Sequence, residues 1–423
     1  MNGSLDVKNG SNFPGVSRFR TDASGTPSAR KWTTRVLRGD DEFKALGRQW
    51  SSLLGECDGS NVFQSHEWLY TWWITYRPEA ELTIVVAERS GKVGGIAPVM
   101  LETTRRGGVT VRVLRFVGDG THETDHMDFL ASRTDRRAIL QALLEGVSAL
   151  DWDIAELNQV PEASPNARDL MEWIGKSGLW RFVKISPCPV CQLPANFQGL
   201  LSALPSRLRT SIRSSRRKLA QRSVVAFGVC KDEEELSTEL AAFFCNHESR
   251  WRGKGATGVF ADARRREFYA RLSPKLLEKG WLRLFFLRLD GRSVAHQYCF
   301  TTGDTVMLLQ EGFDFSLASE NIGNTLRSYV FEHLIDTKVS TYDFLAGASR
   351  HKQNWSNGVV NDLCIHCARP SWRGVFFYLV PRLIERARDV LGTLRDRVYA
   401  VLRERGWPPS LGTRNASGAP DGT

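Results

Sequence analysis

The sequence HETDH, residues 122–126, has the spacing of a zinc-binding motif. In H-E-x-x-H, a helix places two histidines on one face around zinc, and the glutamate acts as the general base of a protease. Here the motif follows a GDG turn after the strand-like VRVLRFVG, and no apolar helical stripe runs through it. We therefore expect a polar loop that leads into a strand, and we expect no metal ion in the protein.

Two C-x-x-C pairs offer a second set of possible metal ligands: Cys188 with Cys191, and Cys364 with Cys367. Four thiolates at such spacing can close a tetrahedral zinc site. The pairs lie about 175 residues apart, whereas a zinc ribbon separates its pairs by about 15–20 residues. Both pairs lie in strand-like segments, where cysteine behaves as a small buried hydrophobic residue. Buried thiols are the expectation, although folding could still bring the two pairs together.

A basic run, SRLRTSIRSSRRKLAQR, contains seven cations from Arg207 to Arg222 and no acidic residue. Helical spacing would spread these charges over more than one face. Two interpretations remain open. The run is either a solvated basic helix or a face that binds the phosphates of a coenzyme, a nucleotide sugar or tRNA.

A strand, a loop and a helix meet near Gly323. The strand-like TVMLLQEGFD is followed by the loop SLASENIG and then by a helical sequence. The backbone N–H groups at such a helix start can hold an anion such as pyrophosphate without a charged side chain. The pattern alone is weak evidence, because any protein that alternates strands and helices contains it.

The composition is that of a globular protein with a substantial core. Of the 423 residues, 42% are hydrophobic and 25% are charged, which excludes a disordered, collagen-like or fibrous chain. No uncharged apolar run approaches the roughly 18–20 residues of a membrane span, and the N-terminus lacks a secretion pattern. We therefore expect a cytoplasmic protein with reduced cysteines. The net charge of +10 predicts attraction to polyanions such as nucleotides, nucleic acid or an anionic membrane.

The elements that must position these residues occur twice in the same order. Each series begins with a strand and two helical segments, which lead to a hairpin that turns at Ser90–Gly91 or at Asp290–Gly291. A further strand, a helix and two last strands follow. Asp-Gly supplies the positive φ that a tight hairpin needs. The repeat, at a period of about 180 residues, predicts an α+β fold built from two similar halves.

These patterns divide the chain into five segments, namely disordered residues 1–30, an N-terminal half 31–190, a C-terminal half 191–370, a basic amphipathic helix 371–408 and disordered residues 409–423. The helix carries eight arginines and four acidic residues between 371 and 407. Two interpretations of it remain open. It either packs on the body of the protein or lies on anionic lipid as a peripheral contact at the inner membrane face.

Many short motifs resemble the CelD/BcsL-like acetyltransferases of the GNAT (Gcn5-related N-acetyltransferase) superfamily. They include NVFQSHEWLYTWW, GGIAPVM, LRFVGDG, HESRW, LDGRSVAHQYCF, IGNTL, YDFLAG and HKQNW, and they cover about residues 32–370. The resemblance implies two tandem GNAT-like domains, as in the FemAB aminoacyltransferases. Each domain would be a mixed, mainly antiparallel sheet flanked by helices.

The resemblance further implies acyl transfer from acetyl-CoA, bound in the C-terminal half, to an amine or hydroxyl. The thioester would lie where TVMLLQEGFD splays from TYDFLAG. The pyrophosphate loop of the superfamily, Q/R-x-x-G-x-G/A, corresponds to residues 320–325, which keep the middle glycine but begin with an acid and end with threonine. The implied cofactor-binding residues are Ile322, Gly323, Asn324 and Thr325.

Transfer to an amine needs a base for its proton and an acid for the leaving thiolate. Under the resemblance, Glu311 is the first candidate base and Asp343 the second, Tyr342 could be the acid, and His296 could relay a proton. Because side chains alternate across a strand, Glu311 could instead face the surface. A structural, half-buried role remains open for His296.

Four further residues could bind the acceptor. Lys352 and Trp355, in HKQNW, match the strongest C-terminal signature of the family, although they could simply join the loop to the core. Arg250 and Trp251 form a similar pair at a helix end, able to stack on and pair with a sugar or nucleotide.

The sequence thus predicts an acetyl-CoA-dependent acyltransferase of polysaccharide biosynthesis or the cell envelope. The acceptor would be a sugar, a polysaccharide precursor or a related small molecule. One alternative is a FemAB-type transferase that uses charged tRNA. The other is a non-catalytic scaffold at a membrane polysaccharide synthase.

Overall fold

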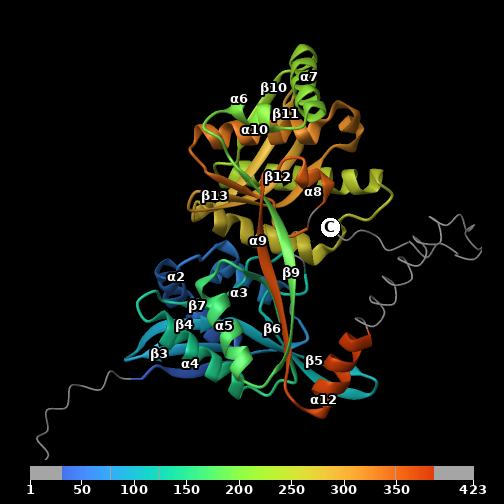
Figure 1. Ribbon diagram of the computed structural model, residues 1–423. Helices are drawn as coiled ribbons and strands as arrows, with labels where there is room; N and C mark the ends of the chain where they lie inside the picture. Colours follow the sequence, from blue (N-terminus) through green and yellow to red (C-terminus); the bar gives the residue numbers. More distant parts are fainter. Residues whose placement is uncertain (1–30, 77, 122, 348, 385–423) are drawn as a thin grey trace, which may run out of the picture. The chain divides into compact units, whose positions relative to one another are not determined.

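The computed structural model of the protein describes residues 31–384 except 77, 122 and 348 (Figure 1). The predicted disordered ends, 1–30 and 409–423, lie outside these residues, as do residues 385–408 of the predicted basic helix. From Trp32 onward the described residues belong to one compact unit. Among them, no helix has both the length and the apolar composition needed to cross a membrane.

The N-terminal part contains nine strands and five α-helices. The strands are β1 (Thr33–Leu37), β2 (Ala80–Leu82), β3 (Ile84–Arg89), β4 (Lys92–Ala97), β5 (Val99–Arg106), β6 (Val109–Phe116), β7 (Leu130–Ala131), β8 (Ile154–Pro161) and β9 (Trp180–Gln192). The α-helices are α1 (Asp40–Ala45), α2 (Gly47–Glu56), α3 (His66–Tyr76), α4 (Arg136–Ala149) and α5 (Pro165–Lys176), and a 3₁₀ turn, η1 (Val62–Gln64), precedes α3.

The C-terminal part contains six strands, β10 (Val225–Val229), β11 (Leu282–Leu289), β12 (Arg292–Thr302), β13 (Thr305–Phe313), β14 (Thr341–Asp343) and β15 (Gly358–Ala368). Its α-helices are α6 (Phe197–Ala203), α7 (Ser206–Arg222), α8 (Glu233–Gly253), α9 (Ala263–Glu278), α10 (Ile322–Asp336), α11 (Arg350–Gln353) and α12 (Trp372–Gly374). The 3₁₀ turns η2 (Val259–Ala261) and η3 (Phe315–Glu320) precede α9 and α10, and the π-helical η4 (Val375–Leu379) extends α12.

Both predicted hairpins turn where the sequence places them. Ser90 and Gly91 have φ values of 53° and 79°, and Asp290 and Gly291 have φ values of 50° and 82°. Positive φ at both central residues gives the turn the twist of the flanking strands, which is why glycine follows a small polar residue at each turn.

Eleven strands form one sheet, in the order β10-β11-β12-β13-β14-β9-β15-β8-β6-β5-β2, and the other four, β1-β3-β4-β7, form a second sheet. The last strand of each half lies against the other half. β9 pairs with β14, β15 pairs with β8, and β9 and β15 pair with each other over their length (Figure 1). The predicted boundary at residue 190 thus falls inside a shared strand, and the division into halves stays a prediction.

Each half contains one parallel strand pair, formed by two strands that flank a helix. β6 pairs with β8 across α4, and β13 pairs with β14 across α10. All other pairings are antiparallel, so the predicted mixed, mainly antiparallel α+β fold is confirmed.

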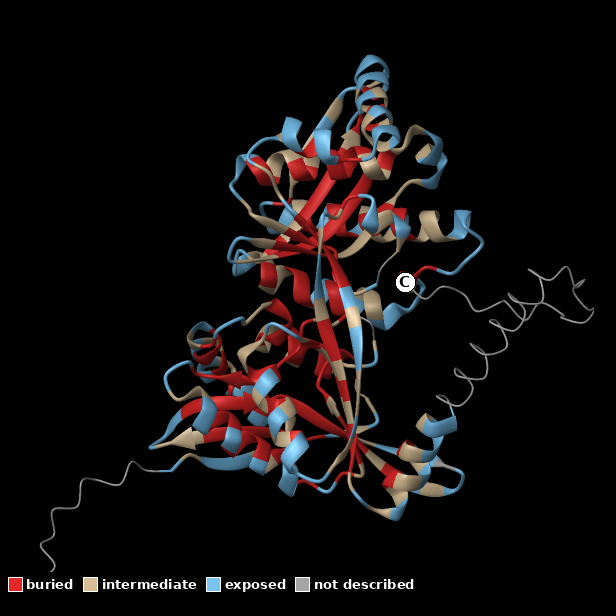
Figure 2. Ribbon diagram, in the orientation of Figure 1, coloured by how far each residue is buried: buried red, intermediate tan, exposed pale blue. Residues whose placement is uncertain are grey.

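Buried residues concentrate on the inner strands and on the helices that cover them (Figure 2). The aromatic helix α3 is buried on nearly every side because it packs between the N-terminal core and α9, where Trp68 and Tyr76 contact Phe268. Strand β12 lies between α8 and α10, and this arrangement positions the site described below.

Helix α5 was absent from the sequence prediction. Ser164 accepts a hydrogen bond from the backbone N–H of Asn166, and Pro165 occupies the first turn. This cap, followed by the buried Ala167, Leu170 and Ile174, is a standard helix signal. The HETDH motif forms no helix over its described residues 123–126, as predicted.

Candidate functional site

Strands β13 and β14 run together for only three residue pairs and then diverge. Their register ends at Met307 opposite Asp343, whereas β13 continues to Phe313. An irregularity in the β12–β13 pairing, at Tyr298/Cys299, lies within the divergent part of β13, opposite Leu308 and Gln310. The site is therefore centred on the unpaired side of β13, next to Glu311.

The Glu311 carboxylate lies within a cluster of two arginines and a histidine. Arg250 of α8 is 3.1 Å from Oε1, His351 Nε2 is also 3.1 Å from Oε1, and Arg327 of α10 binds Oε2. Arg327 has no exposed surface. Its Nη1 also lies 2.6 Å from Nε2 of His351, so four side chains from three helices and one strand form one network.

This network keeps Glu311 ionised. Burial alone would raise the pKa of its carboxyl, but Arg327, Arg250 and His351 hold that pKa well below its usual value of 4.5. A carboxylate with such a low pKa accepts protons poorly near neutral pH. The arrangement fits the binding of an anionic group by the surrounding cations, and the role of Glu311 as base stays a prediction.

Asp343 belongs to a second buried network, which joins three distant parts of the chain. His126 Nε2 is 3.1 Å from Oδ2 of Asp343, and His126 Nδ1 is 2.8 Å from Oδ2 of Asp362 on β15. Burial alone would lower the pKa of His126, but these two carboxylates raise it well above its usual value of 6.5. His126 is therefore a buried imidazolium that donates a hydrogen bond to each aspartate.

We predict that His126 makes the stability of the protein depend on pH. A raised folded-state pKa gives stability that is complete below about pH 6.5 and is lost as pH rises through the folded-state pKa. His126→Asn, which tolerates the φ of 48° at this position, should cost about 3 kcal/mol at pH 6. Urea unfolding at several pH values measures this cost, which should shrink toward pH 9.

His66 provides a control of opposite sign. Burial lowers the pKa of His66, so the contribution of His66 to the free energy of unfolding should grow as pH rises through about 6.5. A cost of His126→Asn that stays constant from pH 6 to 9 would contradict the imidazolium assignment.

Two ionisable side chains lie beside this network. Burial raises the pKa of the half-buried Asp125 to about 6, close to neutrality, with His126, Asp362 and Lys352 as its nearest charges. Lys352 donates from Nζ to the backbone oxygens of Ala346, at 2.7 Å, and Leu345, at 3.4 Å. Asp125 is thus a carboxylate that could accept a proton near neutral pH, and Lys352 fixes the loop after β14.

Tyr342 and His296 lie on opposite faces of the sheet. The buried Tyr342 hydroxyl donates to Oε1 of Gln297 at 2.9 Å, and Gln297 lies opposite Glu311 in the β12–β13 register. His296, the preceding residue on β12, points toward α8, where its Nε2 is 2.8 Å from Oε2 of Glu239. The structure therefore brings Tyr342 to the face of Glu311 but separates His296 from both.

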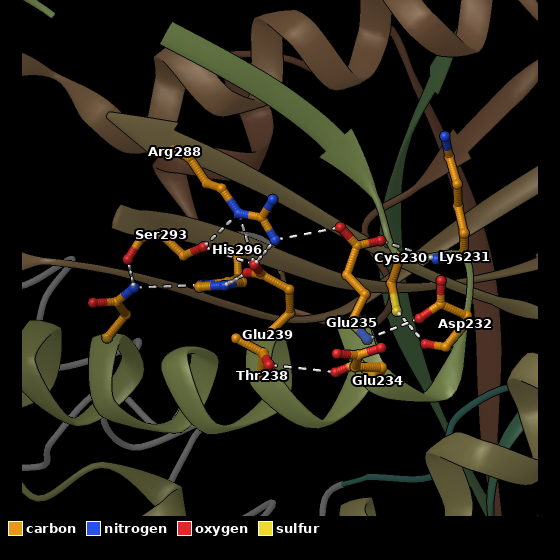
Figure 3. A network of polar contacts seen from close by, with 11 residues as sticks. Cys230, Lys231, Asp232, Glu234, Glu235, Thr238, Glu239, Arg288, Ser293 and His296 are labelled. Carbon is orange, nitrogen blue, oxygen red and sulfur yellow. Dashed lines mark hydrogen bonds and ion pairs between the residues drawn. The ribbon is translucent and has the colours of Figure 1, made fainter. Parts of the chain in front are cut away.

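Glu239 connects His296 to a network of its own (Figure 3). Its Oε1 accepts hydrogen bonds from Arg288 and from Ser293 Oγ, and Asn246 contacts the other nitrogen of His296. With every polar atom of the imidazole engaged and no exposed surface on His296, this arrangement supports a structural role. The proton-relay role stays a prediction without support from geometry.

The four predicted acceptor-binding residues fall into two groups. Arg250 is part of the Glu311 cluster, and its neighbour Trp251 donates from Nε1 to Nε2 of His247 at 3.1 Å. Trp355 is buried beside Arg327 and donates from Nε1 to Oδ1 of Asn324 at 3.0 Å. Trp355 therefore links the loop after β14 to the N-terminal turn of α10, which supports the alternative that HKQNW joins the loop to the core.

Helix α10 is preceded at its N-cap position by Asn321, a residue with a left-handed backbone (φ 57°) whose side chain does not cap the helix. The first-turn N–H groups, which include those of the predicted Ile322, Gly323 and Asn324, have no acceptor within the helix. The N–H of Thr325 instead donates to the carbonyl of Asn321 at 3.0 Å.

The basic run forms helix α7, which packs along α10. Between α7 and the start of α10 lies a groove of about 540 Å³ lined by Ser206, Arg207, Thr210, Ser211, Ser214, Ser215, Lys218, Ser319 and Asn321. Hydroxyls and two cations line it, with no carboxylate. Glu320, the acid in the implied pyrophosphate loop, is paired with Arg222 at 3.2 Å. The groove and the helix start together suit a phosphate-bearing ligand.

The two C-x-x-C pairs do not meet. Cys188 lies opposite Val360 and Cys364 opposite Lys184 in the β9–β15 register. Among residues that the structure describes, the only three potential metal ligands within 4.8 Å of one another are those of His126, Cys188 and Asp362. His122 lies outside the described residues. The expectation that the protein holds no metal stays a prediction.

Several residues of the site were missed from the sequence, namely Arg327, His351, His126, Asp125 and Asp362. Arg327 had a local signal, because it is a charge among the apolar positions Leu326, Val330 and Phe331 of a helix. Asp125 and His126 lie in HETDH and His351 lies in HKQNW, but neither motif by itself indicated this site. Asp362 had no local signal.

Comparison with known proteins identifies part of the chain. Residues 206–353 match the family model described as "Acetyltransferase (GNAT) domain". No curated protein matches the chain by sequence. The match is to GNAT domains in general, so the narrower CelD/BcsL-like resemblance stays a prediction.

Solved structures resemble the chain at low identity. The crystal structure of FemX is 12% identical with a TM-score of 0.52, over 76% of this chain and 95% of that one. The structure of L-PGS from Bacillus licheniformis is 12% identical with a TM-score of 0.46, over 80% and 96%. A tandem GNAT protein from the clavulanic acid biosynthesis pathway is 14% identical with a TM-score of 0.40, over 81% and 100%.

Because the identity is so low, the similarity to FemX concerns the fold alone and shows nothing about activity. The two structures with lower TM-scores add no argument. The sequence match is more specific, because it spans the elements from α7 through α11 that surround the divergence of β13 and β14. The segment that matches the GNAT acetyltransferase model, residues 206–353, thus contains most of the candidate site.

Proposed function

We propose that the protein transfers an acetyl group from acetyl-CoA to an amine or hydroxyl of a cell-envelope sugar, polysaccharide precursor or related small molecule. The observation that carries the proposal is the juxtaposition, within the GNAT-matched segment, of the β13–β14 divergence and a carboxylate-free groove at the start of α10. The acceptor class rests on the sequence resemblance.

In this proposal the α7–α10 groove binds the phosphates of the donor. The N–H groups of Ile322, Gly323 and Asn324 hold the pyrophosphate, and Arg207 and Lys218 add positive charge. The groove fits this role despite the departure from the usual loop, because Arg222 compensates the charge of Glu320. Acetyl-CoA would supply the acyl group as a thioester, which the acceptor attacks as the C–S bond breaks.

The residues at the divergence would then orient the acceptor and manage its proton. Arg250, beside Glu311, and Lys352, in the loop after β14, provide positive charge in this region. Glu311, Asp343 and Asp125 are the carboxylates within reach of this region, and Asp125 has the pKa best suited to accept a proton at neutral pH.

Calorimetric titration with acetyl-CoA tests the donor site. We expect micromolar binding by the wild type and at least a tenfold loss in Gly323→Trp, because a side chain at Gly323 meets the Phe313 ring at 3.3 Å and fills the helix start. Arg207→Glu with Lys218→Glu should weaken binding similarly. Arg217→Glu is the matched control, since Arg217 lies on the same helix but does not line the groove.

Two outcomes would redirect the proposal. Binding by the wild type that none of these variants weakens would place the donor elsewhere. No binding at millimolar acetyl-CoA would rule out the coenzyme as donor. The basic face of α7 would then favour the alternative in which charged tRNA is the donor, and filter binding of tRNA with the same variants would test it.

A further inference from the structure

The helix that follows β15 exposes a continuous apolar stripe. It runs from α12 through η4 to residue 384. The exposed fractions are 57% for Trp372, 64% for Phe376, 37% for Val380, 54% for Leu383 and 48% for Ile384. Their spacing of three to four residues places them on one face of the helix, here called the C-terminal apolar stripe.

The opposite face of the helix is fixed to the sheet. The Tyr378 hydroxyl donates to the backbone oxygen of His366 on β15 at 2.8 Å, and the Arg382 guanidinium stacks 4.7 Å from the centre of the Phe182 ring on β9. Gly374 and Tyr378 are buried on this face. Because this packing sets the rotation of the helix, the stripe faces away from the sheet.

The sequence around the stripe is strongly basic, and the spacing of apolar residues in the stripe continues in the sequence that follows it. Residues 371–407 contain eight arginines, no lysine and four acidic residues, and tryptophans lie near both ends, at 372 and 407. Apolar residues recur at helical spacing beyond the stripe, with Leu391, Leu394 and Val398 as examples. Apolar residues flanked by tryptophan and arginine are typical of helices that lie in the interface of an anionic bilayer.

We propose that the C-terminal apolar stripe is a membrane-binding surface whose partner is an anionic lipid bilayer. Its large side chains enter the headgroup region, and the net positive charge of residues 371–407 attracts the anionic lipid. Charge favours this partner, because the segment is cationic as well as apolar. The inference is independent of the acyl-transfer proposal and would place an acceptor of the cell envelope within reach of the enzyme.

Co-sedimentation of the full-length protein with vesicles tests the surface. The vesicles contain either 70% phosphatidylcholine with 30% phosphatidylglycerol or phosphatidylcholine alone. We expect binding to the anionic vesicles, weaker binding to the neutral ones, and a decrease with rising salt. The double variant Phe376→Glu, Leu383→Glu should bind at least about tenfold more weakly.

Val359→Glu is the matched control, because Val359 is an apolar residue on β15 with 61% exposure that lies outside the stripe. It should bind vesicles like the wild type. Thermal unfolding of all variants shows whether each remains folded. If the double variant does not fold, the single variant Leu383→Glu replaces it.

Three results would overturn the proposal. One is that the wild type does not bind anionic vesicles. Another is that vesicle binding falls equally in the double variant Phe376→Glu, Leu383→Glu and in the control Val359→Glu. The third is a dimer in sedimentation velocity that the stripe variant dissociates without any change in vesicle binding, since the stripe would then bind a second copy of the chain.

Discussion

Replacing Glu311 by glutamine is expected to lower the free energy of unfolding by about 3–5 kcal/mol at pH 7. The substitution leaves Arg327, which has no exposed surface, without its carboxylate partner, and it removes the ionic partner of Arg250. An unpaired charge held away from water is costly because nothing replaces the lost solvation. Urea unfolding at pH 7 measures the effect.

The matched control is Glu332→Gln. Glu332 pairs with Arg216 of α7 but is 38% exposed, so its loss should cost at most about 1 kcal/mol. Equal losses of unfolding free energy in Glu311→Gln and Glu332→Gln would contradict the view that Glu311 stabilises a buried charge.

The cost of Glu311→Gln should also depend on pH. A lowered folded-state pKa gives stability that is present above the unfolded value of 4.5 and is lost as pH falls through the folded-state pKa. The difference between wild type and variant should therefore be constant from about pH 6 to 8 and shrink in strong acid.

A second substitution separates stability from catalysis. Glu311→Gln combined with Arg327→Met removes both buried charges, and such replacements are often nearly neutral for stability. If Glu311 is the base, the double variant should recover stability while turnover remains about 100-fold or more below the wild type. Recovery of turnover along with stability would assign Glu311 a structural role.

Truncation of Trp355 to alanine is expected to cost about 3–5 kcal/mol, as for other large buried aromatic side chains. Trp355 is 1% exposed, packs edge-to-face against Phe331 with ring centres 5.1 Å apart, and bonds Asn324. Because this bond holds the first turn of α10, the variant should also bind acetyl-CoA more weakly if the donor lies there. Thermal unfolding and calorimetry measure the two effects.

Trp372→Ala is the control for tryptophan loss itself. Trp372 is 57% exposed, so its truncation should change the free energy of unfolding by about 0.5 kcal/mol or less. Trp355→Phe keeps most of the ring volume and isolates the indole hydrogen bond. A small cost for Trp355→Ala would mean that the loop after β14 is held by other contacts.

The local structure and the order of the elements could be predicted from the sequence. The turns at Ser90–Gly91 and Asp290–Gly291 could be predicted because positive φ is a property of the residues at the turn. Helix α10 could be predicted because its apolar positions follow the helical period. The repeated order of these elements sufficed for the fold class, whereas the position of the donor site near Gly323 stays a prediction.

Strand pairing and the contacts between charged side chains depend on tertiary packing and could not be predicted. The exchange of β9 and β15 between the halves left no local pattern, since either strand satisfies its hydrogen bonds with any neighbour of suitable register. His126 meets Asp343 and Asp362 across 217 and 236 residues of chain. Alternation along β12 places His296 and Gln297 on opposite faces of the sheet, and the packing of α8 and α10 determines which of them shares the face of Glu311.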